Sequence, residues 1–267
     1  MAVAPPPLQG HLRSCHHFHS TQNAPFSIQL LGKFILKIDG QICNPEKWGR
    51  APSRKLFFLL LINREKAIER DLIIDAIWPD TSLSSCVERF YVALHILRKQ
   101  LGKYADCIVC QNKKYRLTLP PGSEVDVNYF LSLAEQGLLT SDFDILKEAL
   151  NLYKGDLLEE YRYEEFLEEM RNDLRELKQQ LLYKLAAVSL HHNDLDLSLQ
   201  FYQELRSMNP YEELPVMKML ELLQTKGEYV VAANLYLEYS RQILAEFGFN
   251  PSPVLQKIYH QILEHSI

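Results

Sequence analysis

The stretch VERFYVALHILRKQLG, residues 87–102, predicts an amphipathic helix whose two faces differ in composition. Its large apolar residues recur at intervals of three or four positions, which gathers them on one stripe that can be buried. These residues are Phe90, Leu94, Leu97 and Leu101. The opposite face mixes charged, polar and aliphatic side chains: Glu88, Arg89, Val92, His95, Ile96 and Lys99. A face that meets only water has little reason to hold Val92 and Ile96, which raises the question of what it contacts.

The segments on either side of this helix predict strands and further helices. Upstream, FSIQLLGKFILKIDGQIC at 26–43 alternates apolar and polar residues, and its Asp-Gly pair favours a tight turn between antiparallel strands. Downstream, CIVCQNKKYRLTL at 107–119 is typical of a hairpin with a polar tip. Three helices are expected between these β regions, at roughly 53–63, 69–77 and 83–101. Strands, three helices and a terminal hairpin together predict a winged helix-turn-helix.

Five segments of this region resemble the DNA-binding half of the antibiotic regulatory protein type of bacterial activators. They are LGKFILKIDG (31–40), SRKLFFLLLI (53–62), RDLIIDAIWPD (70–80), LHILRKQLG (94–102) and KKYRLTL (113–119). The most distinctive matches are Trp78-Pro79-Asp80 and Tyr115. The resemblance implies a winged helix, related to those of response regulators, whose third helix lies in the major groove of duplex DNA.

The second half of the chain resembles the bacterial transcriptional activator domain. The matching segments are VDVNYF (125–130), ALNLYKGDLLEEY (149–161), NPYEE (209–213) and LAEFGFNPSPVLQKIYHQIL (244–263). Between them lies a repeat of 34 residues, the tetratricopeptide period, which relates Asn193 to Gly227. The same register relates Leu195 to Tyr229, Ser198 to Ala232 and Tyr202 to Tyr236. We expect about seven helices after residue 126, stacked around a continuous core, with the tyrosines packed between helices.

The predicted fold class is mainly α with a small β component. Its expected parts are a flexible tail at 1–25, a winged helix-turn-helix DNA-binding domain at 26–120 and a tetratricopeptide-like bacterial transcriptional activator domain at 121–267. Charge follows the same division, with 16 Lys+Arg against 9 Asp+Glu in residues 26–119, and 12 against 25 in residues 123–267. This asymmetry suggests a module that binds a polyanion followed by a module with another task, although chance segregation of surface charge remains open.

Several classes of protein are disfavoured by what the sequence lacks. It has no GxxxxGK[ST] phosphate loop, GxSxG elbow or HExxH helix, so we expect no enzyme and no cofactor. Five irregularly spaced cysteines do not form a disulfide scaffold and fit a cytoplasmic protein. For Cys107 and Cys110 we expect strand packing, with a zinc site or redox activity as the alternatives. No apolar run approaches the roughly 18 residues that cross a bilayer, so no membrane partner is expected.

The candidate DNA contacts fall into three groups. On the third helix, Arg89 and His95 can bond base edges or phosphates, Glu88 can accept from cytosine, and Val92 and Ile96 can pack on thymine methyl groups. Basic residues elsewhere are better placed for the phosphate backbone, which sets position and salt-dependent affinity. They are Arg98 and Lys99 at the end of the helix, Lys113, Lys114 and Arg116 in the wing, and Arg54 and Lys55 at the start of the first helix. The minor groove is an alternative target for the three wing residues.

The leading hypothesis is a transcription activator whose partner is double-stranded DNA. Resemblance implies binding to direct repeats, with a second copy of the chain as a candidate homodimer partner there, and contact with RNA polymerase through the helical half and the exposed loop at 79–85. Related response-regulator helices usually carry an arginine where this chain has Ile96. The absence of that arginine removes a side chain that reads guanine, worth roughly 1 to 3 kcal/mol of discrimination between bases. Either the DNA site is rich in A·T at that position, or the domain binds DNA weakly. The alternative is an interaction or ligand-sensing scaffold whose winged helix has lost DNA affinity.

Overall fold

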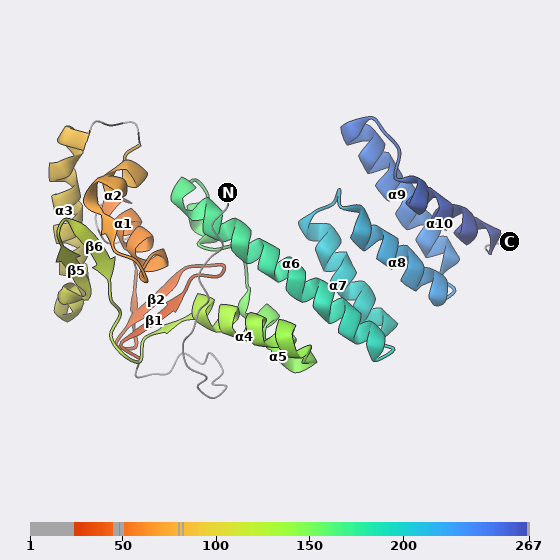
Figure 1. Ribbon diagram of the computed structural model, residues 1–267, viewed down its shortest axis with the longest axis horizontal. Coiled ribbons are helices and arrows are strands. Elements are labelled where there is room, and N and C mark those ends of the chain that lie inside the picture. Colours follow the sequence, from red (N-terminus) through yellow and green to blue (C-terminus); the bar gives the residue numbers. More distant parts are fainter. Residues whose placement is uncertain (1–23, 45–47, 49–50, 80, 82, 266–267) are drawn as a thin grey trace.

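The computed structural model describes residues 24–44, 48, 51–79, 81 and 83–265. Figure 1 shows an elongated molecule, with a small lobe of strands and helices at one end and a stack of helices leading away from it. The predicted fold class, mainly α with a small β component, is confirmed. The tail predicted at 1–25 falls almost entirely on residues 1–23, which lie outside the described residues.

The first lobe contains the three predicted helices between two small sheets. Its helices are α1 (Ala51–Ile62), α2 (Arg70–Ile77) and α3 (Leu83–Leu101). One sheet begins with the antiparallel strands β1 (Phe26–Gln29), β2 (Ile35–Ile38) and β3 (Gln41–Cys43). The other holds β4 (Ile68–Glu69), β5 (Ile108–Gln111) and β6 (Lys114–Leu117), with β6 in the middle. This arrangement is the winged helix-turn-helix expected from the sequence.

Two tight turns shape the sheets as the sequence suggested. Asp39 and Gly40 join β2 to β3 with φ angles of 50° and 77°. Asn112 and Lys113 join β5 to β6 with φ angles of 52° and 60°. Two consecutive residues with positive φ give a turn whose twist matches that of the flanking strands. The wing is therefore a two-residue hairpin with Lys113 at its tip.

The apolar stripe of α3 forms the core of this lobe. Phe90, Leu94, Leu97 and Leu101 are all buried. The ring of Phe90 meets the ring of Tyr115 edge-on, with the ring centres 5.0 Å apart. Tyr115 lies on β6, so this contact fixes the wing against the helix and explains why a tyrosine occupies that position.

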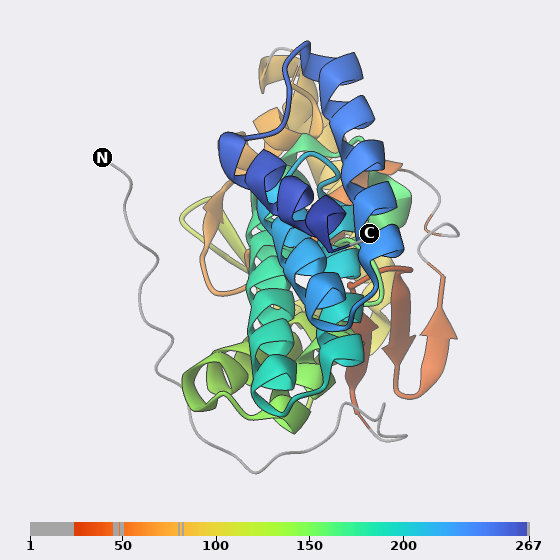
Figure 2. The same cartoon turned by 90° about the vertical axis from the view of Figure 1, so that its right-hand side faces the viewer.

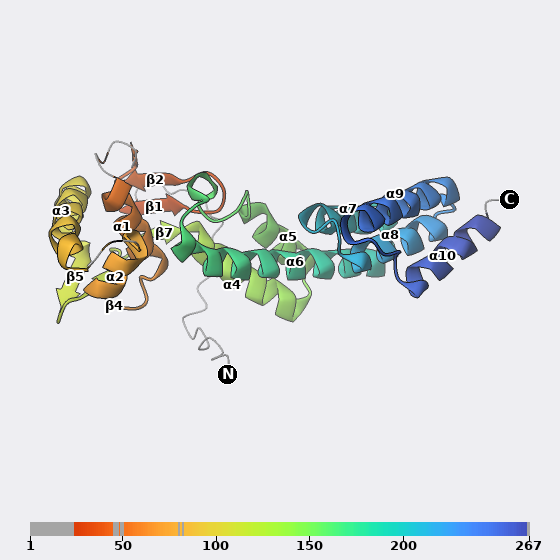
Figure 3. The same ribbon diagram turned by 90° about the horizontal axis from the view of Figure 1, so that it is seen from above.

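The second lobe contains seven helices within the described residues, as expected. They are α4 (Asp126–Thr140), α5 (Phe143–Leu152), α6 (Glu168–His191), α7 (Leu195–Met208), α8 (Glu213–Thr225), α9 (Tyr229–Phe247) and α10 (Pro253–Glu264). Seen along the molecule, α6 to α10 stack behind one another as antiparallel pairs (Figure 2). The view from above shows the same stack leading away from the first lobe (Figure 3).

The 34-residue register predicted from the sequence holds in three dimensions. Leu195 and Tyr229 are the first residues of α7 and α9. The residues before them in the register, Asn193 and Gly227, have φ angles of 61° and 75° and so make equivalent turns. The small pair Ser198 and Ala232 and the aromatic pair Tyr202 and Tyr236 are all buried. The rings of Tyr236 and Tyr259 stack with centres 4.1 Å apart, so the tyrosines pack between helices.

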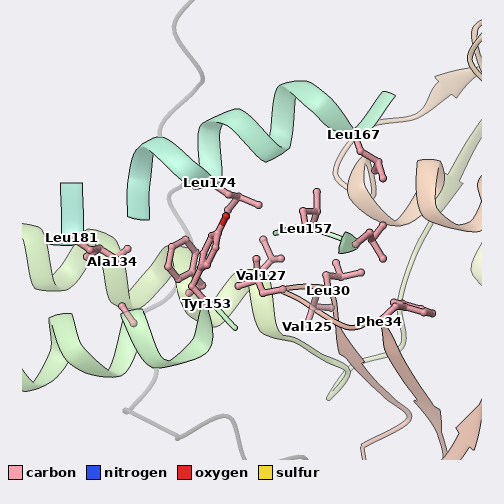
Figure 4. Close-up of a cluster of buried hydrophobic side chains, with 14 of the residues drawn as sticks. Leu30, Phe34, Val125, Val127, Ala134, Tyr153, Leu157, Leu167, Leu174 and Leu181 are labelled. Atoms are coloured by element: carbon pink, nitrogen blue, oxygen red, sulfur yellow. The ribbon is translucent and has the colours of Figure 1, made fainter. Parts of the chain in front are cut away.

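The two lobes meet at a continuous joint that the sequence did not predict. Strand β7 (Glu124–Val125) pairs in parallel with β1, which extends the first sheet into the start of α4. From the other side, the Leu158 amide donates to the Leu30 carbonyl at 2.8 Å and the Gly32 amide to the Asp156 carbonyl at 3.0 Å. Buried leucines, valines and aromatic residues from both lobes fill the space between (Figure 4).

Candidate nucleic-acid interface

The outer face of α3 is open to solvent along its length. Glu88, Arg89, His95 and Lys99 are exposed, and Val92 is 44% exposed. Ile96 is half-buried at the edge of this face. Helix α3 lies at the end of the molecule farthest from α10 (Figures 1 and 3). The mixed face singled out in the sequence therefore does not pack against the helical lobe.

A hollow of about 280 Å³ adjoins this face, between the start of α1, the end of α2 and α3. It is lined by Pro52, Ser53, Trp78, Glu88, Arg89, Val92 and Ala93. The Ser53 hydroxyl is buried there and has no hydrogen-bond partner within the described chain. Pro52, Trp78 and Ala93 line the hollow together with Val92. An apolar group of a partner that contacts Val92 would therefore be shielded from water at this point of the face.

The wing places its cations beside this helix. Lys113, Lys114 and Arg116 are all exposed. The Lys114 ammonium lies 3.1 Å from the Glu69 carboxylate, and the Arg70 amide donates to the Lys113 carbonyl at 2.8 Å. Strand β4 and the start of α2 thus hold the wing tip. Glu69 and Arg70 were not among the residues predicted from sequence, because their role depends on the pairing of β4 with β6.

Arg98 joins α3 to the wing rather than lying wholly on the outer face. It is half-buried, and one of its terminal guanidinium nitrogens donates to the Ile108 carbonyl at 3.1 Å. The sequence placed Arg98 near the edge of the buried stripe, where its stem can pack. A guanidinium has five N–H donors, so the remaining ones stay available for a phosphate.

Arg54 and Lys55 are both engaged with the helical lobe. The Lys55 ammonium lies 2.9 Å from the Glu164 carboxylate, and both side chains are largely shielded from solvent. The Arg54 guanidinium stacks over the Tyr161 ring, 5.0 Å from its centre. The ring of Phe58 meets the same tyrosine at 4.7 Å. These contacts account for both predicted cations without DNA. The sequence gave no sign of them, because Tyr161 and Glu164 lie far from α1 along the chain.

Asp126 and Arg171 are buried charges that support the joint in different ways: Asp126 bonds across it, and Arg171 holds the segment of the helical lobe that meets the first lobe. The Asp126 carboxylate, 1% exposed, accepts from the backbone amides of Leu30, Leu31 and Val127 at 2.8 to 2.9 Å. Burial raises the pKa of Asp126 to about 6, although these donors favour its ionised form. The Arg171 side chain is 3% exposed. It donates to four carbonyl oxygens, those of Leu157, Leu158, Tyr161 and Arg162, and to the Glu168 carboxylate.

The described residues contain no group of three or more histidine, cysteine or acidic side chains placed to hold a metal ion. Cys110 is exposed on β5, whereas Cys107 is half-buried in the turn before it, where burial raises the pKa of its thiol. Within the same residues, no helix has both the length and the hydropathy to cross a bilayer.

Comparison with known proteins identifies the family to which this architecture belongs. The model of the bacterial transcriptional activator domain family matches residues 125–263, more than half of the chain. The chain belongs to this family. It is 24% identical over 227 residues to the transcriptional regulatory protein MoaR1 of Mycobacterium tuberculosis, covering 80% of this chain and 73% of MoaR1. It is 22% identical over 245 residues to the transcriptional regulatory protein EmbR of the same species, covering 88% of this chain and 62% of EmbR.

A solved structure shares the fold. Mycobacterium tuberculosis EmbR in complex with a low affinity phosphopeptide has a TM-score of 0.71 at 21% identity, covering 91% of this chain and 65% of that one. The chain thus spans less than two thirds of EmbR. The family and the relatives' names identify this member of the bacterial transcriptional activator domain family as a transcriptional regulator of the antibiotic regulatory protein type.

Proposed function

We propose that this regulator binds duplex DNA through the outer face of α3 and the β5–β6 wing. The observation that carries the proposal is the exposure, along one helix face, of groups that read bases and groups that bind phosphate. Val92 and His95 lie in the middle of that face, with Lys99 toward its end. A helix of this kind fits the major groove, where each base pair presents a distinct pattern of donors, acceptors and methyl groups.

The roles of the individual residues follow from their positions. Arg89 and His95 donate to base edges or phosphates, Glu88 accepts from cytosine, and Val92 packs on a thymine methyl group. Lys99, Lys113, Lys114 and Arg116 neutralise phosphates, and Arg98 adds to them while it braces the wing. Ile96 lies at the edge of the face and supports an A·T preference there. Arg54 and Lys55 contribute mainly to the joint, where their contacts already account for them.

The helical lobe supplies the protein contacts of the regulator. We place RNA polymerase, other transcription proteins or a second copy bound at a direct repeat on this side, because the first lobe presents its open helix face away from it. The segment at 79–85, whose last three residues begin α3, is a further candidate for the polymerase, although Asp80 and Ser82 lie outside the described residues.

A polarisation titration with genomic fragments at two salt concentrations tests the DNA proposal. We expect sequence preference and an affinity that falls steeply as salt rises, because phosphate contacts release counterions. Affinity without preference, or without salt dependence, would reject α3 as a reader of sequence.

A protein-interaction scaffold is the second candidate, and one observation favours it. Ile96 stands half-buried where related helices usually offer a guanidinium, so the reading face has fewer donors. In that case the same titration gives a slope of log affinity against log salt near zero, and the acidic helical lobe binds the partner.

A further inference from the structure

A second hollow, of about 450 Å³, lies between the wing and the helical lobe. Three parts of the chain line it: the loop after α1 with Arg64 and Glu65, strand β6 with the linker at 116–123, and the first turn of α4. Its volume falls within the range of roughly 300 to 1,000 Å³ that is typical of sites for small molecules. No residue of α3 lines it, so it is separate from the reading face of that helix.

The charge of this hollow favours an anion. Two cations, Arg64 and Arg116, line the hollow, whereas Glu65 contributes the single carboxylate. The Arg64 guanidinium donates to the Leu61 carbonyl at 3.0 Å and to the Asn128 side-chain oxygen, which leaves further N–H groups unused. Burial lowers the pKa of Arg64, and the group stays a cation with reduced hydration. A cation in that state gains more from a bound anion than an exposed one does.

Other donors converge on the same space. The Ser123 hydroxyl is buried and has no hydrogen-bond partner within the described chain. Thr118 lines the same hollow. Val125 and Asn128, at the start of α4, line it as well, so the first turn of a 15-residue helix faces it. Amide groups in a first helical turn lack acceptors within the helix and carry partial positive charge. The Asp126 carboxylate, which would oppose an anion, is directed at the amides of Leu30 and Leu31, just after β1, and at the Val127 amide of its own helical turn, so that amide is already bonded.

We propose that this hollow binds a small phosphate-bearing molecule, with its phosphate held by Arg64, Arg116, the Ser123 hydroxyl and the first turn of α4. Arginine side chains and helix N-termini both recognise phosphate, and here they face one space. The ligand would join β6, and hence the wing, to α4 of the helical lobe. This binding does not require DNA, so it stands or fails separately from the DNA proposal.

Calorimetry and amide NMR on the full chain, without DNA, test the site. The probes are inorganic phosphate and adenosine monophosphate, with adenosine as the control that lacks phosphate, all at matched ionic strength in chloride. We expect a single saturable site for both phosphate probes, none for adenosine, and shifts of the Ser123 and Asn128 amide resonances.

Variants separate this site from general attraction to a basic surface. Arg116→Gln should weaken phosphate binding by about tenfold and Ser123→Ala by a smaller factor, since each removes a phosphate donor. Lys257→Gln, an exposed cation on α10, is the matched control and should leave the binding unchanged. Arg64→Lys keeps the charge of a residue that also holds Asn128, and should weaken binding without unfolding the chain. Absent binding, equal loss from Lys257→Gln, or shifts confined to α3 and the wing tip would overturn the proposal.

Discussion

The outer face of α3 and the start of α1 carry the same kinds of residue but meet different surroundings. Arg54 and Lys55 follow the sequence pattern of a phosphate-binding helix start, yet Tyr161 and Glu164 of the helical lobe engage both. Arg89 and Lys99 on α3 remain exposed. A cation is most available to DNA where the fold leaves it exposed and away from the helical lobe. Basic residues of one lobe can therefore divide between binding and assembly.

The largest effect that sharpens this comparison is expected at Arg171, which holds the 157–162 segment of the helical lobe that meets the first lobe. Arg171→Met keeps much of the side-chain volume but leaves four carbonyl oxygens and the Glu168 carboxylate without their donor. We expect the free energy of unfolding to fall by about 4 kcal/mol, the range for breaking a buried charged network. Urea unfolding measures this loss. Stability within 1 kcal/mol of the native chain would mean that the joint is not held by this residue.

The next effect concerns Asp126 and pH. Its pKa in the folded chain, about 6, lies above the ordinary value of 3.8, so the folded state holds an extra proton between these values. The stability from this group is therefore present below about pH 4 and is lost as pH rises through 6, by up to about 3 kcal/mol. Unfolding followed from pH 4 to pH 7 should show the decline, and Asp126→Ala should lack it. An equal decline in both proteins would assign the titration to another group.

A smaller effect is expected on the reading face. Val92→Ala and His95→Ala should each change the preference between DNA sites by about 1 to 2 kcal/mol, because each removes a contact to a base edge. Competition titrations with pairs of sites measure the change. Both variants should have the same free energy of unfolding as the native chain. An effect on DNA recognition can then be told apart from an effect on stability. The same loss for every site would show that α3 lies along the backbone without reading bases.

The sequence predicted the elements and faces far better than it predicted the joint. Periodicity and turn residues are local signals, so the bounds of α1 to α3 to within two residues, a polar hairpin tip at 111–114 and the 34-residue register could all be predicted. The joint depends on residues 95 or more positions apart, such as Leu30 and Asp126. Nothing near an aspartate in sequence shows that it will face amides from a distant strand. For the same reason, the sequence indicated cations that suit DNA but not which of them the helical lobe would engage.

The central claim is that α3 and the wing, not the start of α1, meet DNA phosphates. It is tested most directly by the salt dependence of DNA affinity in Lys99→Ala and Lys55→Ala, measured by polarisation on one fragment over a series of salt concentrations. The account predicts that Lys99→Ala reduces the slope of log affinity against log salt by about 0.9, the value for one lost phosphate contact, and weakens binding to all sequences alike. Lys55→Ala should leave the slope unchanged. A reduced slope for Lys55→Ala with an unchanged one for Lys99→Ala would contradict the account.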